Sequence, residues 1–458
     1  MGFGELLPAT PEFVSRPADR KRQMTPSRDT TKVVIVGGGG TMGSSTALHL
    51  IRSGYSPSNI TVLDVYPIPS AQSAGFDLNK IMSIRLRNKP DLQLSLEALD
   101  MWRNDPLFKP FFHNVGMIDC SSSKEGIANL RRKHQTLIDA GVGLDKANTW
   151  LESEDELLAK MPWFTKEHVK GWKGLFTTDG GWLAAAKAIN AIGRFLKSQG
   201  VQFGFGGQAF AIVATVFCAY TVIGPTVDGT QYYADRIILA AGAWTPSLVD
   251  VEDQCVSKAW VLAHIQLTPE EAAQYKNIPV VYDGEYGFVF EPNEDGIIKI
   301  CDEFPGFTHF KKHQPFGAAH PKLISVPRSH ASHPTDSYPD ASEASIRKAM
   351  GRFLPDLRDR KIVDRAMCWC TDTADASLLI CEHPKWKNLI LATGDSGHTF
   401  KLLPNIGKHV VELLEGTLPQ QLAESWRWRP WDDALKSRRA APAKDLADMP
   451  GWKHDARL

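Results

Sequence analysis

The sequence predicts an α/β protein in which a Rossmann-like nucleotide-binding domain of discontinuous segments is interrupted by an α+β domain with a large antiparallel sheet. Three observations predict this fold. A glycine-rich turn joins an apolar strand to a helix near residue 40, apolar strands that end in glycine recur near residues 240 and 390, and the region between those strands alternates apolar and polar residues. A chain of 458 residues is also long enough for two domains.

The first βαβ unit begins with the apolar run 33–36. A glycine-rich turn follows, then a helix expected over 44–52, and then a second apolar run, 60–64, which ends in Asp64. A strand, a glycine turn, a helix and a strand tipped by an acid form the unit that binds a dinucleotide. Asp64 is therefore expected to accept hydrogen bonds from the ribose hydroxyls of NAD or FAD.

The glycine turn itself reads Gly38-x-Gly40-x-x-Gly43. We expect Gly38 to allow the tight turn, Gly40 to let the backbone approach a pyrophosphate, and Gly43 to let helix and strand pack closely. Thr41 and Met42 open the helix whose N-terminus would hold the diphosphate among unpaired N–H groups.

Later segments predict the rest of both domains. Helices are expected over 92–103 and 182–199, the second with alanines that suit close packing against a sheet. The apolar runs 237–241 and 389–393 are predicted to be late strands of the parallel sheet, and the alternation over 260–305 predicts an antiparallel sheet.

Composition excludes several classes of function. The 52 basic and 52 acidic residues balance, which argues against a nucleic-acid surface or a polybasic membrane contact. The apolar segment 209–223 is shorter than the roughly 20 residues of a membrane span, so buried strands are the better interpretation. Seven scattered cysteines without a secretory signal predict free thiols. Because Cys368 and Cys370 have one residue between them and no second pair, no metal site is expected.

The two ends of the chain lie outside this pattern. Residues 1–31 mix Pro, Arg, Asp and Thr without apolar periodicity, which predicts a disordered leader, and Met24 is a possible alternative start. Ala456-Arg457-Leu458 is a conservative variant of the Ser-Lys-Leu address. It predicts recognition by the peroxisomal import receptor and a peroxisomal location, with the cytoplasm as the alternative.

Three strings carry a resemblance to a known family: GGTMGSSTALHL at 39–50, MCWCTDTAD at 367–375, and the segment 394–408. They resemble the fructosyl amino acid and fructosyl peptide oxidases, or amadoriases, which share a D-amino acid oxidase or sarcosine oxidase-like fold. The peptide oxidases look most similar, and the resemblance runs over about 32–452. It implies that FAD oxidises the C–N bond of an Amadori product, giving an imine that hydrolyses to glucosone and an amino acid or peptide, while O2 becomes hydrogen peroxide.

The resemblance also implies a domain division. The first 31 residues would be a leader and 431–458 a tail with the peroxisomal signal. The FAD-binding domain would comprise 32–90, 170–258 and 360–430, and the substrate domain 91–169 and 259–359.

Several site residues follow from the family's motifs. Cys368 matches the cysteine that carries the flavin through its 8α carbon, although Cys370, two residues on along a strand, points to the same face and spacing alone does not separate them. Lys299 matches the lysine that activates oxygen, where a fixed cation stabilises the negative charge developing on O2. Lys80 matches a lysine beside the isoalloxazine ring. Gly397, in the turn after the last parallel strand, is expected to contact the cofactor.

The substrate is expected to meet a second set of residues. Glu303 would accept hydrogen bonds from sugar hydroxyls or the substrate ammonium, and Lys401 would hold the carboxylate end close to the flavin. Arg85 would stand at the entrance, and Trp244 would line the site. A further carboxylate-binding arginine is expected among Arg427, Arg429, Arg438 and Arg439.

Two stretches depart from expectation or stay open. The relatives carry a polar strand pair where residues 208–220 of this chain are apolar, which would expose an adhesive edge and suggests a mispredicted exon boundary or a local rearrangement. The Pro-, His- and Ser-rich stretch 313–342 is expected to be a surface excursion. The chain is expected to be a monomer, and its preference among glycated amino acids and dipeptides stays open.

Three alternative functions also stay open at this point. The first is a sarcosine- or pipecolate-type amine oxidase with the same flavin geometry. The second is a protein that senses a nucleotide without turnover, and the third is an NAD-dependent dehydrogenase. Lys299, Lys401 and Cys368 argue against the sensor, because binding alone requires neither oxygen activation nor a thioether. Against the dehydrogenase, no second glycine-rich nicotinamide motif appears, and a covalent cysteine would make no sense for a dissociable cosubstrate.

Overall fold

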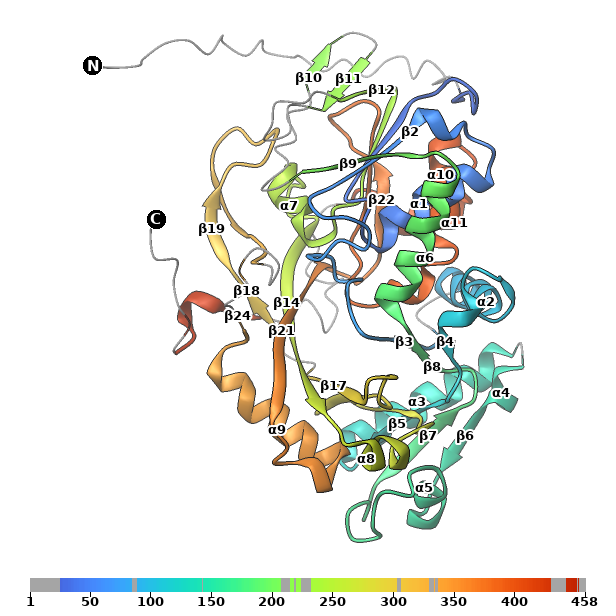
Figure 1. Cartoon of the computed structure of the whole chain (residues 1–458), viewed down its shortest axis with the longest axis vertical. Coiled ribbons are helices and arrows are strands. Elements are labelled where there is room, and N and C mark those ends of the chain that lie inside the picture. Colours follow the sequence, from blue (N-terminus) through green and yellow to red (C-terminus); the bar gives the residue numbers. More distant parts are fainter. Residues whose placement is uncertain are drawn as a thin grey trace.

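The computed structural model describes residues 25–84, 89–141, 143–206, 215–217, 220–223, 232–302, 306–328, 333, 337–429, 442–450 and 452, with the backbone alone for 215–217 and 220–223. Two large sheets organise these residues. Figure 1 shows one sheet in the upper half of the molecule and the other in the lower half, and the long strands β14 and β21 of the lower sheet extend up towards the first.

The upper sheet has six strands and both of its faces are buried. Val33 and Ile35 of its first strand pack into one core, while Val34 and Val36 pack into another. Such burial explains the continuous apolar runs of the sequence. In spatial order the strands are β22 (Leu379–Glu382), β23 (Leu389–Thr393), β13 (Arg236–Leu239), β1 (Val33–Val36), β2 (Ile60–Asp64) and β9 (Gln202–Phe205). Five of these strands run parallel to one another, and the edge strand β22 runs antiparallel to its neighbour β23.

Helices cover one face of this sheet, and α1 lies between α6 and α10. The contact with α10 is close, because a Cβ on Gly407 would lie 2.1 Å from the carbonyl oxygen of Ser45. The predicted helix over 182–199 begins only at Ala185, since the residues before it form a strand. The helices of this layer are α1 (Thr41–Arg52), α2 (Lys89–Asn104), α6 (Ala185–Ser198), α10 (Ile406–Glu415) and α11 (Gln420–Trp426).

The lower sheet is mostly antiparallel, as predicted for the middle of the chain. Its two longest strands, β14 (Cys255–Gln266) and β21 (Ile362–Thr373), pair over almost their full length. The predicted boundaries assign β21 and β7 to the FAD-binding domain. Both lie in this sheet, because β21 pairs with β14 and β7 pairs with β5 and β6. The other strands are β24 (Lys444–Asp445), β18 (Phe307–Thr308), β17 (Ile297–Cys301), β16 (Gly287–Val289), β15 (Val280–Asp283), β5 (Met117–Ser121), β7 (Lys173–Thr177) and β6 (Asn148–Leu151).

Smaller elements complete the described chain. The stretch expected as a surface excursion begins in a hairpin of β19 and β20, and the described part of the apolar segment 209–223 forms strands β10 and β11. The small sheets comprise β3 (Lys80–Met82), β8 (Gly181–Leu183) and β4 (Phe112–His113); β19 (Phe310–His313) and β20 (Lys322–Ser325); and β10 (Thr215–Phe217), β11 (Tyr220–Ile223) and β12 (Tyr232–Ala234). The further α-helices are α3 (Lys124–Ala140), α4 (Leu144–Ala147), α5 (Glu154–Lys160), α7 (Thr245–Leu248), α8 (Pro269–Gln274) and α9 (Asp340–Phe353). Short 3-10 helices are η1 (Pro57–Asn59), η2 (Lys109–Phe111), η3 (Gly242–Trp244), η4 (Pro355–Leu357), η5 (Phe400–Leu402) and η8 (Leu446–Asp448).

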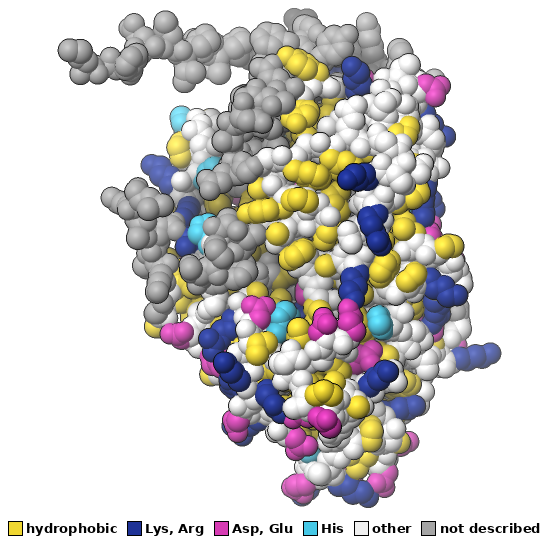
Figure 2. All heavy atoms as spheres, in the orientation of Figure 1, with side chains coloured by type: hydrophobic (Ala, Val, Ile, Leu, Met, Phe, Trp, Pro, Cys, Tyr) yellow, Lys and Arg dark blue, Asp and Glu magenta, His cyan; other side chains and the backbone are white. Residues whose placement is uncertain are grey.

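The surface agrees with the balanced charge of the sequence. Acidic and basic side chains are interspersed over the lower part of the face drawn in Figure 2. Within the described ranges, no helix is long and apolar enough to cross a membrane. No group of three or more His, Cys, Asp or Glu side chains in those ranges could hold a metal ion.

Candidate active site

A cavity of about 910 Å³ lies where the strands of the parallel sheet end. Its walls include the residues that follow β1, β2, β13 and β23, which is the usual place for a ligand in an open α/β sheet. The lining residues from these strand ends are Val36, Gly37, Asp64, Val65, Tyr66, Ala240, Ala241, Gly242, Ala392 and Thr393.

In the glycine turn at this cavity, the positive φ angle lies at Gly37 and not at Gly38, where the tight turn was predicted. Gly37, with φ +82°, is the residue in the left-handed conformation. Gly38 is needed for space, because a Cβ there would lie 2.2 Å from Cγ1 of Val62 on β2. Gly43 packs as predicted, since its Cβ would lie 2.4 Å from the Gly37 carbonyl oxygen. Gly40 lines the cavity at the N-terminus of α1, together with Thr41 and Met42.

Asp64 also lines the cavity, and it is buried. Its carboxylate accepts hydrogen bonds from the Ser70 hydroxyl and from the Gly39 N–H at 2.8 Å. Burial raises the pKa of Asp64, and these hydrogen bonds act in the opposite direction. Asp64 therefore stabilises the glycine turn through the Gly39 N–H and also faces the cavity.

We expect Gly43→Ala to lower the flavin content of the purified protein strongly. The added Cβ would lie 2.6 Å from Gly38 Cα as well as against the Gly37 carbonyl, so the turn has to move away from α1. The matched control is Gly206→Ala, because a Cβ at Gly206 meets nothing within 4 Å. Flavin absorbance per protein measures the effect, and equal flavin content in the two variants would contradict the assigned packing role.

A partly buried charged cluster lies beside the cavity, and we call Asp77, Lys80, Lys299 and Cys368 the Asp77 cluster. Oδ2 of Asp77 accepts hydrogen bonds from Nζ of Lys299 and is paired with Nζ of Lys80, each at 2.6 Å. Lys80 Nζ lies 3.5 Å from the Cys368 sulfur, and Lys299 also donates to the Asn79 carbonyl at 3.0 Å. Three strands, β3, β17 and β21, thus bring together side chains that are far apart in sequence.

The charges of the Asp77 cluster stabilise one another. Burial alone would raise the pKa of Asp77, but the ammonium groups of Lys299 and Lys80 outweigh it and hold that pKa well below its usual value. Burial would likewise lower the pKa of Lys80, whereas Asp77 keeps it well above its usual value. Lys80 and Lys299 therefore form one charged unit with Asp77. Of this cluster, Lys80 lines the cavity, whereas Cys368 is not among the lining residues.

We expect Asp77→Asn to lower the free energy of unfolding by about 3–5 kcal/mol, because it leaves the buried ammonium group of Lys299 and the partly buried one of Lys80 without their counter-charge. Since the pKa of Asp77 is below its usual value, the ion pairs contribute fully above about pH 4 and are lost as the pH falls further. Urea unfolding at pH 7 and in acid measures this. The control is Asp100→Asn at an exposed carboxylate, and a loss that persists unchanged in acid would contradict the role of Asp77.

Cys368 is the more reactive of the two neighbouring thiols by its surroundings. A hydrogen bond with Cys370 and the nearby Lys80 ammonium together outweigh the effect of burial and lower the pKa of Cys368 to about 6. Cys368 is then a thiolate at neutral pH, the nucleophilic form. Cys370 is buried and lines the cavity.

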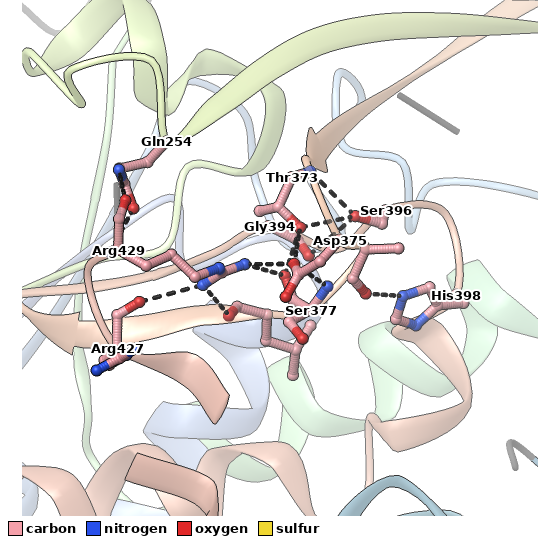
Figure 3. Close-up of polar contacts among 11 residues, drawn as sticks. Gln254, Thr373, Asp375, Ser377, Gly394, Ser396, His398, Arg427 and Arg429 are labelled. Atoms are coloured by element: carbon pink, nitrogen blue, oxygen red, sulfur yellow. Dashed lines mark hydrogen bonds and ion pairs between the residues drawn. The ribbon is translucent and has the colours of Figure 1, made fainter. Parts of the chain in front are cut away.

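The other predicted residues fall into three groups. Trp244 and Gly397 line the cavity, and Lys401 is buried on η5, where its Nζ donates to the Ser83 hydroxyl at 2.9 Å. Arg429 is bound by the turn after β21, as Figure 3 shows, and Arg427 is exposed. The residues outside the described ranges are Arg85, Glu303, Arg438 and Arg439.

Comparison with known proteins decides whether the family of this chain uses NAD or FAD. The sequence model of the family described as DAO, FAD dependent oxidoreductase, matches residues 32–413. This chain belongs to the FAD-dependent oxidoreductases. The family decides between the two dinucleotides that the glycine turn left open.

Among the proteins similar to this FAD-dependent oxidoreductase are oxidases of three kinds. A solved fructosyl peptide oxidase from E. terrenum is 75% identical, with a TM-score of 0.91 over 94% of this chain and 100% of that chain. Amadoriase II, a fructosamine oxidase of Aspergillus fumigatus solved with FSA, is 35% identical, with a TM-score of 0.79 over 94% and 98%. The L-saccharopine oxidase of Schizosaccharomyces pombe is 31% identical over 415 residues, 88% of this chain and 94% of its own. The resemblance and the fold class predicted from the sequence are confirmed.

The residues present in this oxidoreductase fit FAD. The glycine turn leaves room for a backbone contact with a diphosphate, and the cavity continues from it to Lys80 and Cys370. Asn79 is fully buried, and neither polar atom of its side-chain amide has a hydrogen-bond partner among the described residues. Because an unsatisfied buried amide is costly, a ligand beside Lys80 is the natural source of that partner.

Sequence reasoning missed several residues of this oxidoreductase's site. Asp77 holds two lysines together, and an acid three residues before Lys80 is the only sign of it in the sequence. The stretch expected to be a surface excursion contributes His313, Gln314 and Phe316 to the cavity wall. Gln314 is exposed, as expected for a surface stretch, but the chain at and after β19 also contacts α7 and Val249, and so reaches the cavity.

Proposed function

We propose that this FAD-dependent oxidoreductase oxidises Amadori products, either fructosyl amino acids or fructosyl dipeptides. The substrate amine would lose two electrons and two protons, and hydrolysis of the resulting C=N bond would release glucosone and the free amino acid or peptide. O2 would take up the electrons and protons as hydrogen peroxide. The carrying observation is the Asp77 cluster, in which a lysine pair stands beside the cofactor cavity. The substrate class is supported by the similarity to fructosyl peptide oxidases.

The chain's own residues would divide the work around a cofactor that accepts electrons from the substrate and passes them to O2. Lys299, held by Asp77 and the Asn79 carbonyl, would present a fixed cation to the negative charge that develops on O2. Lys401, oriented by Ser83, would hold the substrate carboxylate. Glu303 and Arg85 stay predicted contacts for the sugar and for the entrance.

The attachment of FAD through Cys368 is part of this proposal. The lowered pKa of Cys368 and the Lys80 ammonium 3.5 Å from its sulfur support Cys368 over Cys370 as the nucleophile. A peroxisomal location through Ala456-Arg457-Leu458, import by the peroxisomal receptor, and a monomeric state stay predictions. Peroxide production would suit a compartment that contains catalase.

A peroxide assay of the purified protein tests the substrate class. Fructosyl valine, fructosyl lysine and fructosyl valyl-histidine are the expected substrates, and sarcosine and pipecolate are the alternatives of the same fold. Saccharopine is included because a curated relative is an L-saccharopine oxidase. Turnover of sarcosine, pipecolate or saccharopine alone would reject the proposal.

A further inference from the structure

A short segment after α11, residues 426–429, binds the loops that line the cofactor cavity. It lies outside the match to the family, which ends at residue 413. Trp426 is buried in the core beneath the parallel sheet, and Trp428 packs into the core on the opposite face. The two tryptophans fix this segment, so that Arg429 enters a polar network rather than solvent (Figure 3).

Arg429 is held through both its backbone and its side chain. Its N–H donates to Oε1 of Gln254 at 2.7 Å, and Nε2 of Gln254 donates to its carbonyl. Its Nη2 donates to Oδ1 of Asp375 at 2.7 Å and to the Ser377 carbonyl at 3.3 Å, while Nη1 donates to the Leu378 and Arg427 carbonyls. The guanidinium thus spans the whole turn between β21 and β22.

That turn is bound in its own right to the cavity loop, which we define as residues 395–400. Thr373 donates its N–H to the Ser396 hydroxyl at 3.2 Å, and its own hydroxyl donates to the Ser377 carbonyl at 2.6 Å. His398 lies 2.9 Å from the Ala376 carbonyl through Nε2. These hydrogen bonds connect Arg429 to the cavity loop through residues 373–377.

The cavity loop needs such support because of its backbone. Ser396 has φ +44°, a conformation that residues with side chains rarely adopt, and its N–H donates to the Thr371 carbonyl at 2.8 Å. Asp395, Gly397, Thr399 and Phe400 of this loop line the cavity, and Lys401 follows directly. A shift of the 373–377 turn would reach these residues through the hydrogen bonds just named.

We propose that Arg429 is a positioning residue that sets the cavity loop, and through it the flavin environment and Lys401. Arg429 is not among the residues that line the cavity. It acts by clamping Asp375 and the carbonyls of Ser377 and Leu378, so that the strained loop keeps one geometry. The effect on the flavin goes beyond the proposed function, whereas the effect on turnover rests on it.

The test compares three holoenzyme variants with the wild type. Arg429→Met removes the guanidinium, and Arg429→Lys keeps the charge but loses the fork that reaches several acceptors at once. Arg427→Met is the matched control, because it removes the same charge from an exposed side chain two residues away. The substrate-free readouts are the visible spectrum and midpoint potential of the bound flavin, and stopped-flow reduction by fructosyl valine follows.

We expect both Arg429 variants to shift the flavin spectrum and potential and to slow flavin reduction about tenfold to a hundredfold. Reoxidation by O2 should change far less than reduction, because Lys299 lies on β17 in the other sheet. Arg427→Met should match the wild type in every readout. If Arg429→Met fails to fold, Arg429→Lys decides alone.

Two results would overturn the proposal. One is that the Arg429 variants melt at a lower temperature but keep native spectra, potentials and reduction rates, which would make the contact merely structural. The other is that Arg427→Met produces the same changes. If wild-type protein fails to oxidise any fructosyl substrate, the proposed function falls, and the spectrum and potential still decide the role of Arg429.

Discussion

Lys299→Met is expected to slow the reoxidation of reduced flavin by O2 about 10²–10³-fold, the usual cost of removing one preorganised electrostatic group from an active site. Lys299 is 2% exposed, and its Nζ is held by Asp77 and by the Asn79 carbonyl. Solvent therefore does not compensate for the loss of this cation. Methionine keeps the length of the side chain and removes only the cation. Flavin reduction by substrate should change far less.

Stopped-flow measurement of the two half-reactions separates these effects. Lys187→Met serves as the control, because this lysine is exposed and pairs with Glu294 at the surface. Equal slowing of reduction and reoxidation in Lys299→Met would remove the proposed role in oxygen activation. A melting temperature near that of the control would show that the remaining pair of Asp77 and Lys80 keeps the site folded.

Cys368→Ser is expected to abolish covalent flavin, from nearly complete attachment to none. The reason is the nucleophile: the pKa of Cys368 is lowered to about 6, so a thiolate is present at neutral pH, whereas a serine hydroxyl stays protonated. After acid precipitation the flavin should remain in the supernatant. Fluorescence of the protein band on a denaturing gel gives the same answer independently.

The control for this second prediction is Cys370→Ser, two residues away on the same strand. We expect it to keep its flavin through acid precipitation, although loss of the hydrogen bond to Cys368 should slow the attachment. If Cys370→Ser released its flavin and Cys368→Ser retained it, the two assignments would be exchanged. Release of flavin by the wild-type protein would remove covalent attachment altogether.

Much of the nucleotide-binding domain could be predicted because its determinants are local. A strand, a glycine turn and a helix that follow one another over 33–52 require no knowledge of distant residues, and the apolar runs at 237 and 389 are recognisable as buried strands. The predicted start of the helix at 182 was wrong for the opposite reason. Trp182 pairs with Ile81 in a small sheet, a contact that local periodicity does not record.

Within the candidate site, sequence motifs indicated the lysines and the cysteine as candidates but did not indicate the residues that contact them. Asp77 belongs to no sequence motif. Its role depends on β17, which places Nζ of Lys299 2.6 Å from the Asp77 carboxylate although the two residues are 222 positions apart in the sequence. Arg429 was a candidate for binding a substrate carboxylate. Its guanidinium donates hydrogen bonds to Asp375 and to neighbouring carbonyls, which supports the positioning role that we propose.

The sequence by itself determined the fold class, the dinucleotide turn and the types of side chain at the site, because these depend on residues adjacent in the chain or on recognisable motifs. Only the tertiary structure decided which charges meet. Ion pairs and loop clamps form between segments that strand pairing brings together, and the energy of a buried charge depends on the neighbours it acquires there. The Asp77 cluster and the Arg429 network are therefore properties of the folded chain.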